Sequence, residues 1–187
     1  GISCVAIYTE ADKDTPYVRE ADQAFKLSDS YLNSKEILDI ALKSNSDAIH
    51  PGYGFLSENA AFANQVKKLN IKWVGPSSNA IKKMGDKLTA KEIAIKANVP
   101  TLPMTSDPKK ANSIGYPILV KAAAGGGGKG MRIVEKAKDL KESIKAAERE
   151  AEGGFGDKRV FLERYIKRSR HIEIQILGDI YGNVIYL

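Results

Sequence analysis

The segment from Lys121 to Val134, KAAAGGGGKGMRIV, carries the residues most suited to binding a ligand. Four adjacent glycines, Gly125–Gly128, are followed by Lys129 and Gly130, and such a run costs a folding chain conformational entropy. Exposed backbone N–H groups of a glycine-rich loop can cradle phosphates, and a lysine beside them adds positive charge. The segment therefore predicts a phosphate-binding loop, and the plainer alternative is a hairpin turn without a ligand.

Two familiar phosphate-binding motifs do not fit this loop. Gly125, Gly127 and Gly130 satisfy the spacing G-x-G-x-x-G, but the dinucleotide-binding motif opens a helix, and here a strand pattern follows. A P-loop needs Gly-Lys and then Ser or Thr, whereas Lys129 is followed by glycine. The remaining prediction is a lid at the tip of a β-hairpin that closes over phosphates, as the glycine-rich loop of protein kinases does.

Polar residues in the neighbouring strands add to the predicted site. Lys121 stands in the apolar run YPILVKAAA, where an unpaired ammonium is costly, so it needs an anionic or polar partner such as a bound nucleotide. In FLERYI, alternation places Phe161, Glu163 and Tyr165 on one face. Residues 171–177, HIEIQIL, alternate likewise, with isoleucines on a buried face and polar side chains on the other, which taken alone favours a solvent-facing side.

The elements expected before the loop alternate between strands and helices. Strand patterns at CVAIYTE, at the start of DAIHPGYGF, which continues as a turn, and at IKWVG are separated by the helices SKEILDIALKSN and SENAAFANQVKKLN, with Ser34 and Ser57 as N-caps. Their inward faces are expected to comprise Ile37, Leu38, Ala41 and Leu42 in the first helix and Ala60, Phe62, Ala63 and Val66 in the second. Such alternation predicts a doubly wound, Rossmann-like α/β domain with a parallel sheet over residues 1–84. Ligands bind at the carboxyl ends of such strands, where HPGYGF lies.

After Met84 the pattern changes. A helix at GDKLTAKEIAIKANVP precedes the two strands that flank the glycine loop, and the helix DLKESIKAAEREA precedes three strands at RVFLERYI, HIEIQILGD and GNVIYL. Strands joined by short turns, with the helices grouped apart, indicate an antiparallel sheet in an α+β domain. We predict a second domain over residues 85–187, with the boundary near Gly85.

Composition narrows the class of protein. Lys and Arg total 29 against 23 for Asp and Glu, but the excess is spread over helix faces, which argues against a nucleic-acid partner. A single cysteine gives no internal disulfide and suits a reducing compartment. No apolar run approaches the roughly 20 residues of a membrane span. We expect a cytoplasmic protein, or a mitochondrial one if its source is eukaryotic.

The strings AIHPGYGFLSEN, WVGP, MGDK, YPILVKAAAGGGGKGMRIV, VFLERYI and RHIEIQILGD occur in a characteristic order and spacing. In this the chain resembles, over essentially its whole length, the biotin carboxylase subunit or domain of biotin-dependent carboxylases of the acetyl-CoA and propionyl-CoA carboxylase type. These are ligases of the ATP-grasp superfamily. The resemblance implies phosphorylation of bicarbonate by ATP to carboxyphosphate, which delivers CO2 to a ureido nitrogen of biotin. Alternatives are another ATP-grasp ligase, such as a relative of carbamoyl phosphate synthetase, or a non-catalytic nucleotide-binding fragment.

The resemblance also implies cofactors and partners. It implies ATP, two Mg2+ ions with ligands outside this chain, and biotin on a separate carboxyl carrier protein or domain. A carboxyltransferase would use the product, and the full-length subunit would form a homodimer. The carboxylated acceptor, an acyl-CoA as in fatty acid metabolism or pyruvate, is chosen by that separate enzyme. Both ends of the chain read as strands, so we expect an internal fragment. The resemblance implies that the opening strand of the first domain precedes Gly1 and that the general base and arginines follow Leu187, so the fragment alone would be inactive.

Site roles carry over by resemblance only. Lys87 and Lys121 are similar to the lysines of the phosphate and adenine sites. The lid would comprise Gly125, Gly126, Gly127, Gly128, Lys129 and Gly130, with Met131 packed on the adenine. Glu163 and Ile166 would bind the adenine edge, His171 would lie near the ribose, and Tyr53 would line the biotin and bicarbonate end. Ala124 stands where many members have another glycine. Without the resemblance, Tyr53 is explained as part of a turn and His50 as a core histidine.

Overall fold

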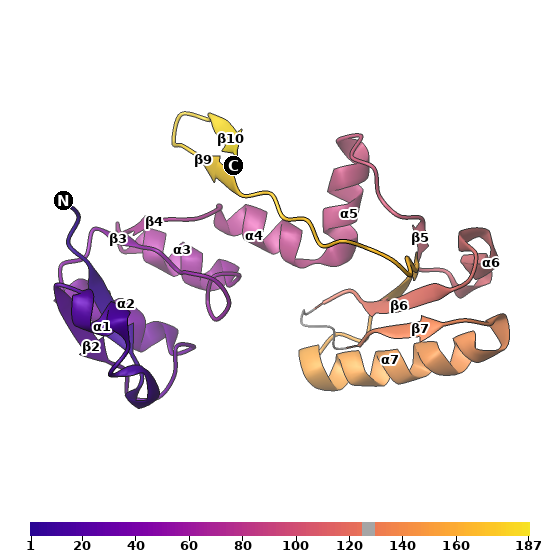
Figure 1. Ribbon diagram of the computed structural model, residues 1–187, viewed down its shortest axis with the longest axis horizontal. Helices are drawn as coiled ribbons and strands as arrows, with labels where there is room; N and C mark the ends of the chain where they lie inside the picture. The colour runs from indigo at the N-terminus through magenta and orange to yellow at the C-terminus, as the bar shows by residue number, and fades with distance from the viewer. Residues whose placement is uncertain (125–129) are drawn as a thin grey trace. The chain divides into compact units, whose positions relative to one another are not determined.

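The computed structural model describes residues 1–124 and 130–187, which divide into two compact units (Figure 1). The first unit contains Gly1–Thr101 together with Ala123 and Ala124, and the second contains Leu102–Ala122 and the described residues from Gly130 onward. This division follows spatial contacts. The domain boundary expected near Gly85 stays a prediction.

In the first unit, short parallel strands alternate with helices. Strand β1 (Val5–Tyr8) pairs in parallel with β2 (Gln23–Lys26), and β3 (Ala48–Ile49) pairs in parallel with β4 (Lys72–Trp73). The helical elements are η1 (Glu10–Asp12), α1 (Pro16–Glu20), α2 (Ser34–Lys43), α3 (Ala60–Lys68), α4 (Ser78–Gly85) and α5 (Lys87–Lys96). Parallel strands joined through helices confirm the α/β class predicted for this half of the chain.

The core of the first unit is built on helix α3. Phe62, Ala63 and Val66 recur at helical spacing and are all buried, as the sequence predicted. The ring of Phe62 meets Trp73 of β4 edge-on, with the ring centroids 5.8 Å apart. The indole N–H of Trp73 also donates a hydrogen bond to the carbonyl of Pro76 at 3.0 Å, so this core residue ties β4 to the turn that follows it.

The predicted helix caps are wrong by one or two residues. Helix α2 is capped by Asn33 and not by Ser34, and helix α3 is capped by Asn59 and not by Ser57. Each asparagine side chain accepts a hydrogen bond from the backbone N–H three residues later. Asparagine and serine are equally favourable N-cap residues. Where both occur near a helix start, the residue type alone therefore does not determine which of them is the N-cap. The inward face expected for α2 also fails at Leu42, which is half exposed.

The second unit contains a four-stranded antiparallel sheet in the order β5-β8-β6-β7. Its strands are β5 (Met104–Thr105), β6 (Ile118–Ala122), β7 (Arg132–Val134) and β8 (Val160–Arg164). Its helical elements are η2 (Pro108–Lys110), α6 (Ala111–Ile114), η3 (Ala137–Asp139) and α7 (Leu140–Phe155). The antiparallel sheet confirms the predicted α+β class, and β6 and β7 form the hairpin that flanks residues 125–129.

One face of this sheet is buried against helix α7 (Figure 1). Ile118 and Val120 of β6 are fully buried there and pack with Leu140 and Ala147 of the helix. Because side chains alternate along a strand, the residues that follow each of them, Leu119 and Lys121, lie on the opposite face. The fold of the hairpin therefore directs the lysine away from the apolar core.

The C-terminal residues form a separate hairpin of β9 (Ile176–Gly178) and β10 (Val184–Tyr186). The strand predicted from residue 171 is wrong for residues 171–175, which are not part of a sheet. Its predicted buried face is wrong as well, because Ile172, Ile174 and Ile176 are each more than half exposed. Alternation specifies a buried face only where another layer covers it, and no such layer is present among the described residues. Within the described part of the chain, no helix combines the length and apolarity needed to cross a membrane.

Candidate nucleotide-binding site

Lys121 and Glu163 form a partly buried ion pair on the face of the sheet opposite α7. In the antiparallel pairing of β6 with β8, Leu119 stands opposite Glu163 and Lys121 opposite Phe161, so all four side chains share that face. The Nζ atom of Lys121 lies 3.0 Å from Oε2 of Glu163, and the two side chains are 23% and 7% exposed. The anionic partner expected for Lys121 is therefore a carboxylate of the same unit.

The ring of Phe161 is a second neighbour of the Lys121 ammonium. The Nζ atom lies 5.7 Å from the ring centroid, within the range of cation–π attraction. Phe161 is 1% exposed and is among the largest fully buried side chains. Sequence alternation placed Phe161 and Glu163 on one face, but only the register between β6 and β8 reveals that both meet the lysine.

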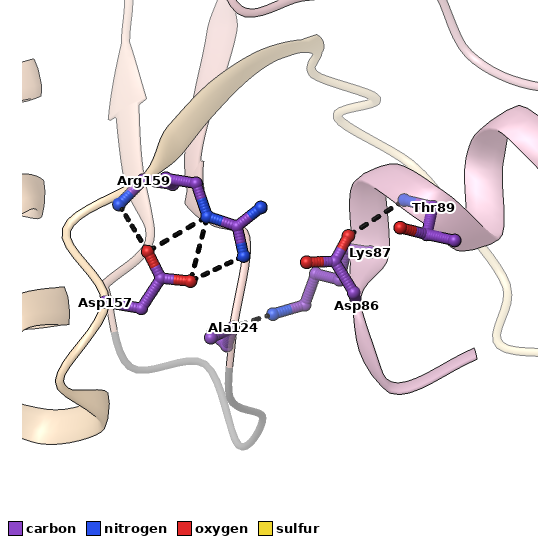
Figure 2. A network of polar contacts seen from close by, with 6 residues as sticks. All are labelled: Asp86, Lys87, Thr89, Ala124, Asp157 and Arg159. Carbon is purple, nitrogen blue, oxygen red and sulfur yellow. Dashed lines mark hydrogen bonds and ion pairs between the residues drawn. The ribbon is translucent and has the colours of Figure 1, made fainter. Parts of the chain in front are cut away.

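Lys87 begins helix α5 beside the backbone that leads into the glycine segment (Figure 2). Its backbone N–H donates to the carbonyl of Ala123 at 3.2 Å, and its Nζ donates to the carbonyl of Ala124 at 3.4 Å. The helix is capped by Asp86, whose side chain accepts from the backbone N–H of Thr89 at 2.8 Å. A helix N-terminus and an ammonium group both favour anions, so this end of α5 suits a phosphate.

The glycine segment itself is only partly described. Gly125, Gly126, Gly127, Gly128 and Lys129, the centre of the predicted lid, lie outside the described residues. Gly130, the last glycine of the predicted lid, has a φ of +70°, which L side chains rarely adopt. A Cβ atom at this position would also lie 3.0 Å from Cβ of Ala122 on β6. Met131 and Ile166, the residues predicted to flank the adenine, are both nearly half exposed.

A surface ion pair braces the turn between α7 and β8 (Figure 2). The guanidinium of Arg159 contacts both carboxylate oxygens of Asp157, with its Nη2 atom 2.6 Å from Oδ2 and its Nε atom 3.0 Å from the same oxygen. These hydrogen bonds hold the pKa of Asp157 below its ordinary value. The pair joins two residues of the turn immediately before β8 begins at Val160.

The HPGYGF segment forms an exposed turn in the first unit. Gly52 and Gly54 both have positive φ values, and Tyr53 between them is almost fully exposed. His50 is exposed, so its interpretation as a core histidine is wrong, and its Nδ1 atom accepts a hydrogen bond from the backbone N–H of Gly52 at 3.1 Å. The ring of Phe55 packs on Tyr31 with the centroids 5.0 Å apart.

Tyr31 connects this turn to the first strand through a hydrogen-bond network that the sequence did not predict. Its hydroxyl donates to the carboxylate of Asp12 and accepts from the backbone N–H of Thr9 at 3.1 Å. It also lies 3.0 Å from the hydroxyl of Tyr17. Burial and the bond to Asp12 raise the pKa of Tyr31 to about 12, and the same bond lowers the pKa of Asp12. Nothing in the local sequence pattern signals these long-range partners.

The last predicted residue, His171, lies in the segment that forms no strand. Its side chain is mostly exposed, and its Nε2 atom lies 2.9 Å from Oε1 of Glu173. Its role beside a ribose stays a prediction. Among residues 1–124 and 130–187, no group of three or more His, Cys, Asp and Glu side chains is arranged to hold a metal ion.

The second unit thus combines an antiparallel sheet, a glycine-rich segment between β6 and β7, and a lysine–glutamate pair on the sheet face opposite α7. Residues 86–187 match the family model described as carbamoyl-phosphate synthase L chain, ATP binding domain. Residues 1–81 match the model described as biotin carboxylase, N-terminal domain. The chain belongs to the biotin carboxylase family.

Individual relatives agree with this assignment. Over 200 aligned residues, the whole chain is 46% identical to Biotin carboxylase 1 of Bacillus subtilis (strain 168) and 46% identical to the mitochondrial methylcrotonoyl-CoA carboxylase subunit alpha of Dictyostelium discoideum. It spans 44% and 29% of their lengths. The biotin carboxylase domain of the Hydrogenobacter thermophilus 2-oxoglutarate carboxylase, solved with MgADP, ADP and bicarbonate, matches with a TM-score of 0.91 and 43% identity, over 100% of this chain and 44% of that one.

Proposed function

We propose that this chain is the part of a biotin carboxylase that holds the nucleotide during ATP-dependent carboxylation of biotin by bicarbonate. The observation that carries the proposal is the partly buried pair of Lys121 and Glu163 on the sheet face opposite α7, in a chain that matches both family models. A carboxylate that is 93% removed from water with an ammonium as its partner is a costly arrangement for stability alone. A buried charge with a specific partner therefore marks a candidate functional site.

The match of residues 1–81 favours this reaction over carbamoyl phosphate synthesis. The description of the second family model names carbamoyl-phosphate synthase, but it covers only the ATP-binding half of the chain. The first half, which contains HPGYGF, matches a biotin carboxylase model. Both reactions start from phosphorylated bicarbonate, so the shared ATP-binding half does not distinguish them.

The chain's own residues would bind and orient the nucleotide. Lys121 would exchange the carboxylate of Glu163 for an anionic oxygen or a ring nitrogen of ATP, and Glu163 would accept a hydrogen bond from the adenine amino group. Lys87 would exchange the carbonyl of Ala124 for a phosphate oxygen. Met131 and Ile166 would enclose the base, His171 would approach the ribose, and Tyr53 would line the biotin and bicarbonate end.

The metal and the partners belong to the proposal as well. Mg2+ bound to ATP would neutralise phosphate charge, and by the resemblance its protein ligands would lie outside this chain. Biotin would arrive on a carrier protein or domain, a carboxyltransferase would use the carboxylated product, and the full-length subunit would be a homodimer. The cytoplasmic location stays a prediction.

The reaction is tested on a longer polypeptide that contains this chain. We expect ATP cleavage that requires bicarbonate and is stimulated by free biotin. Lys121→Ala is expected to weaken MgATP affinity by about 1–3 kcal/mol, the range for a charge-assisted hydrogen bond, and Lys145→Ala on the outer surface of α7 to have no effect. ATP cleavage that depends on ammonia and is not stimulated by biotin would support carbamoyl phosphate synthesis. Equal MgATP affinities of wild type and Lys121→Ala would show that Lys121 does not bind the nucleotide.

A further inference from the structure

The ammonium of Lys121 has two neighbours of different chemistry. Glu163 is an anion that forms a hydrogen bond at 3.0 Å, and Phe161 is an uncharged ring whose centroid lies 5.7 Å away. Phe161 stands directly opposite Lys121 in the β6–β8 register, whereas Glu163 is reached diagonally. The ring therefore occupies the cross-strand position nearest the lysine backbone.

The ring is fixed where the lysine is adjustable. Phe161 is 1% exposed and its backbone belongs to a strand paired on both sides, with β5 and with β6. The lysine side chain keeps 23% of its surface exposed and has four rotatable bonds. A rigid aromatic face beside a flexible ammonium restricts the positions that the ammonium occupies.

We propose that Phe161 is a positioning residue for Lys121, holding its ammonium on the sheet face opposite α7 while the lysine exchanges Glu163 for a nucleotide. This inference rests on the proposed function. When the carboxylate turns to another partner, the ring remains, because it has no hydrogen bond of its own to satisfy elsewhere. An attraction to the ring quadrupole also leaves the full positive charge available to the incoming anion.

Nucleotide binding would strengthen this contact. A ligand over the sheet removes water from the part of Lys121 that is now exposed, and cation–π attraction grows when the cation is desolvated. The first unit contains a second lysine–phenylalanine contact for comparison, in which Nζ of Lys43 lies 5.8 Å from the ring centroid of Phe25. There the lysine is exposed and the ring is not fully buried, so water screens the attraction.

The test replaces Phe161 with phenylalanine carrying one, two or three ring fluorines, which weaken the ring quadrupole with little change of shape. Lys121 is then labelled in the intact chain with an amine-reactive ester, and the labelling rate of each lysine is read by peptide mass spectrometry. The reagent attacks the neutral amine, whereas the ring attracts only the ammonium. Each added fluorine weakens that attraction, so the labelling rate of Lys121 is expected to rise stepwise, by about two- to fivefold in total. The same series at Phe25 should change the rate for Lys43 by much less.

A labelling rate of Lys121 that stays constant across the series, at unchanged thermal stability, would overturn the positioning role and leave Phe161 as a space-filling residue. Phe161→Leu is the second variant, and it should label at least as fast as the trifluoro protein; a rate equal to wild type would contradict the proposal even if the fluorinated proteins were misfolded. The proposed function is read separately in the wild-type chain. Protection of Lys121 by ADP supports nucleotide binding, and labelling that ignores ADP counts against it without affecting the fluorine series.

Discussion

Lys121 and Glu163 are diagonal neighbours across two antiparallel strands, and their charged atoms meet at 3.0 Å in a setting that is largely closed to water. Arg132 and Glu150 form a pair with the same separation, 3.0 Å, but with side chains that are 41% and 44% exposed. The two pairs in one unit differ mainly in burial. They therefore provide a matched comparison of what burial does to an ion pair.

Glu163→Gln should destabilise the second unit by about 1–3 kcal/mol, because it leaves a partly buried ammonium without its charged partner. Glu150→Gln should cost at most about 1 kcal/mol, because water already solvates both members of that pair. Amide hydrogen exchange of β6 and β8 under native conditions measures the free energy of opening for each variant. Equal losses for the two substitutions would show that burial does not set the strength of the Lys121 pair.

Gly130→Ala should destabilise the hairpin by about 1–2 kcal/mol, since it places a side chain at positive φ and pushes its Cβ against Ala122. Gly153→Ala in helix α7 is the control, because Gly153 has a helical setting and a Cβ atom added there would have no neighbour within 4 Å. That substitution should stabilise the helix by about 0.5–1 kcal/mol. Thermal unfolding followed by far-UV circular dichroism should give shifts of opposite sign, and two shifts of the same sign would contradict the strain assigned to Gly130.

The Tyr31–Asp12 contact predicts a pH dependence for the first unit. The pKa of Tyr31 is raised from 10.0 to about 12, so its contribution to stability is present below pH 10 and is lost as the pH rises toward 12. The pKa of Asp12 is lowered from 3.8, so its contribution is present above that value and is lost as the pH falls through the lower one. The difference in stability between wild type and Tyr31→Phe should therefore shrink at both extremes.

The single tryptophan makes this measurement specific. Trp73 lies in the core of the first unit, so its fluorescence during urea unfolding follows that unit. Tyr17→Phe is the control, because it leaves the bond between Tyr31 and Asp12 intact and should keep the alkaline loss. A difference between wild type and Tyr31→Phe that stayed constant from about pH 7 to pH 12 would mean that the hydroxyl of Tyr31 has no role in stability.

Hydrophobic periodicity predicted many of the helices and strands of this fold. It failed where the formation of a strand depends on pairing with another strand. Phe62, Ala63 and Val66 are buried as their spacing indicated, and the strands beside the glycine segment pair as predicted. Short strands such as β2 have too few residues to show a period, so β2 was missed. Residues 171–175 show a clear period without a sheet partner, so the strand expected there does not form.

The candidate site was predictable in part for the same reason. Lys121 stood out because a charge in an apolar strand needs a partner, and Glu163 lay on a face that alternation could define. That these two residues meet depends on the register between β6 and β8, which are far apart in sequence. Phe161 carries no chemical signal of its own in the sequence, and the Tyr31 network joins residues that no local pattern connects.

The two faces of strand β6 have different roles: Ile118 and Val120 fill the core, while Leu119 and Lys121 face the candidate site. Inserting or deleting one residue within β6 would exchange the two sides, driving the ammonium into the core and bringing the valine to the surface. Changes of chain length during evolution should therefore be confined to the connections outside this strand. Substitutions within it should keep apolar volume at Ile118 and Val120 and the ammonium at Lys121.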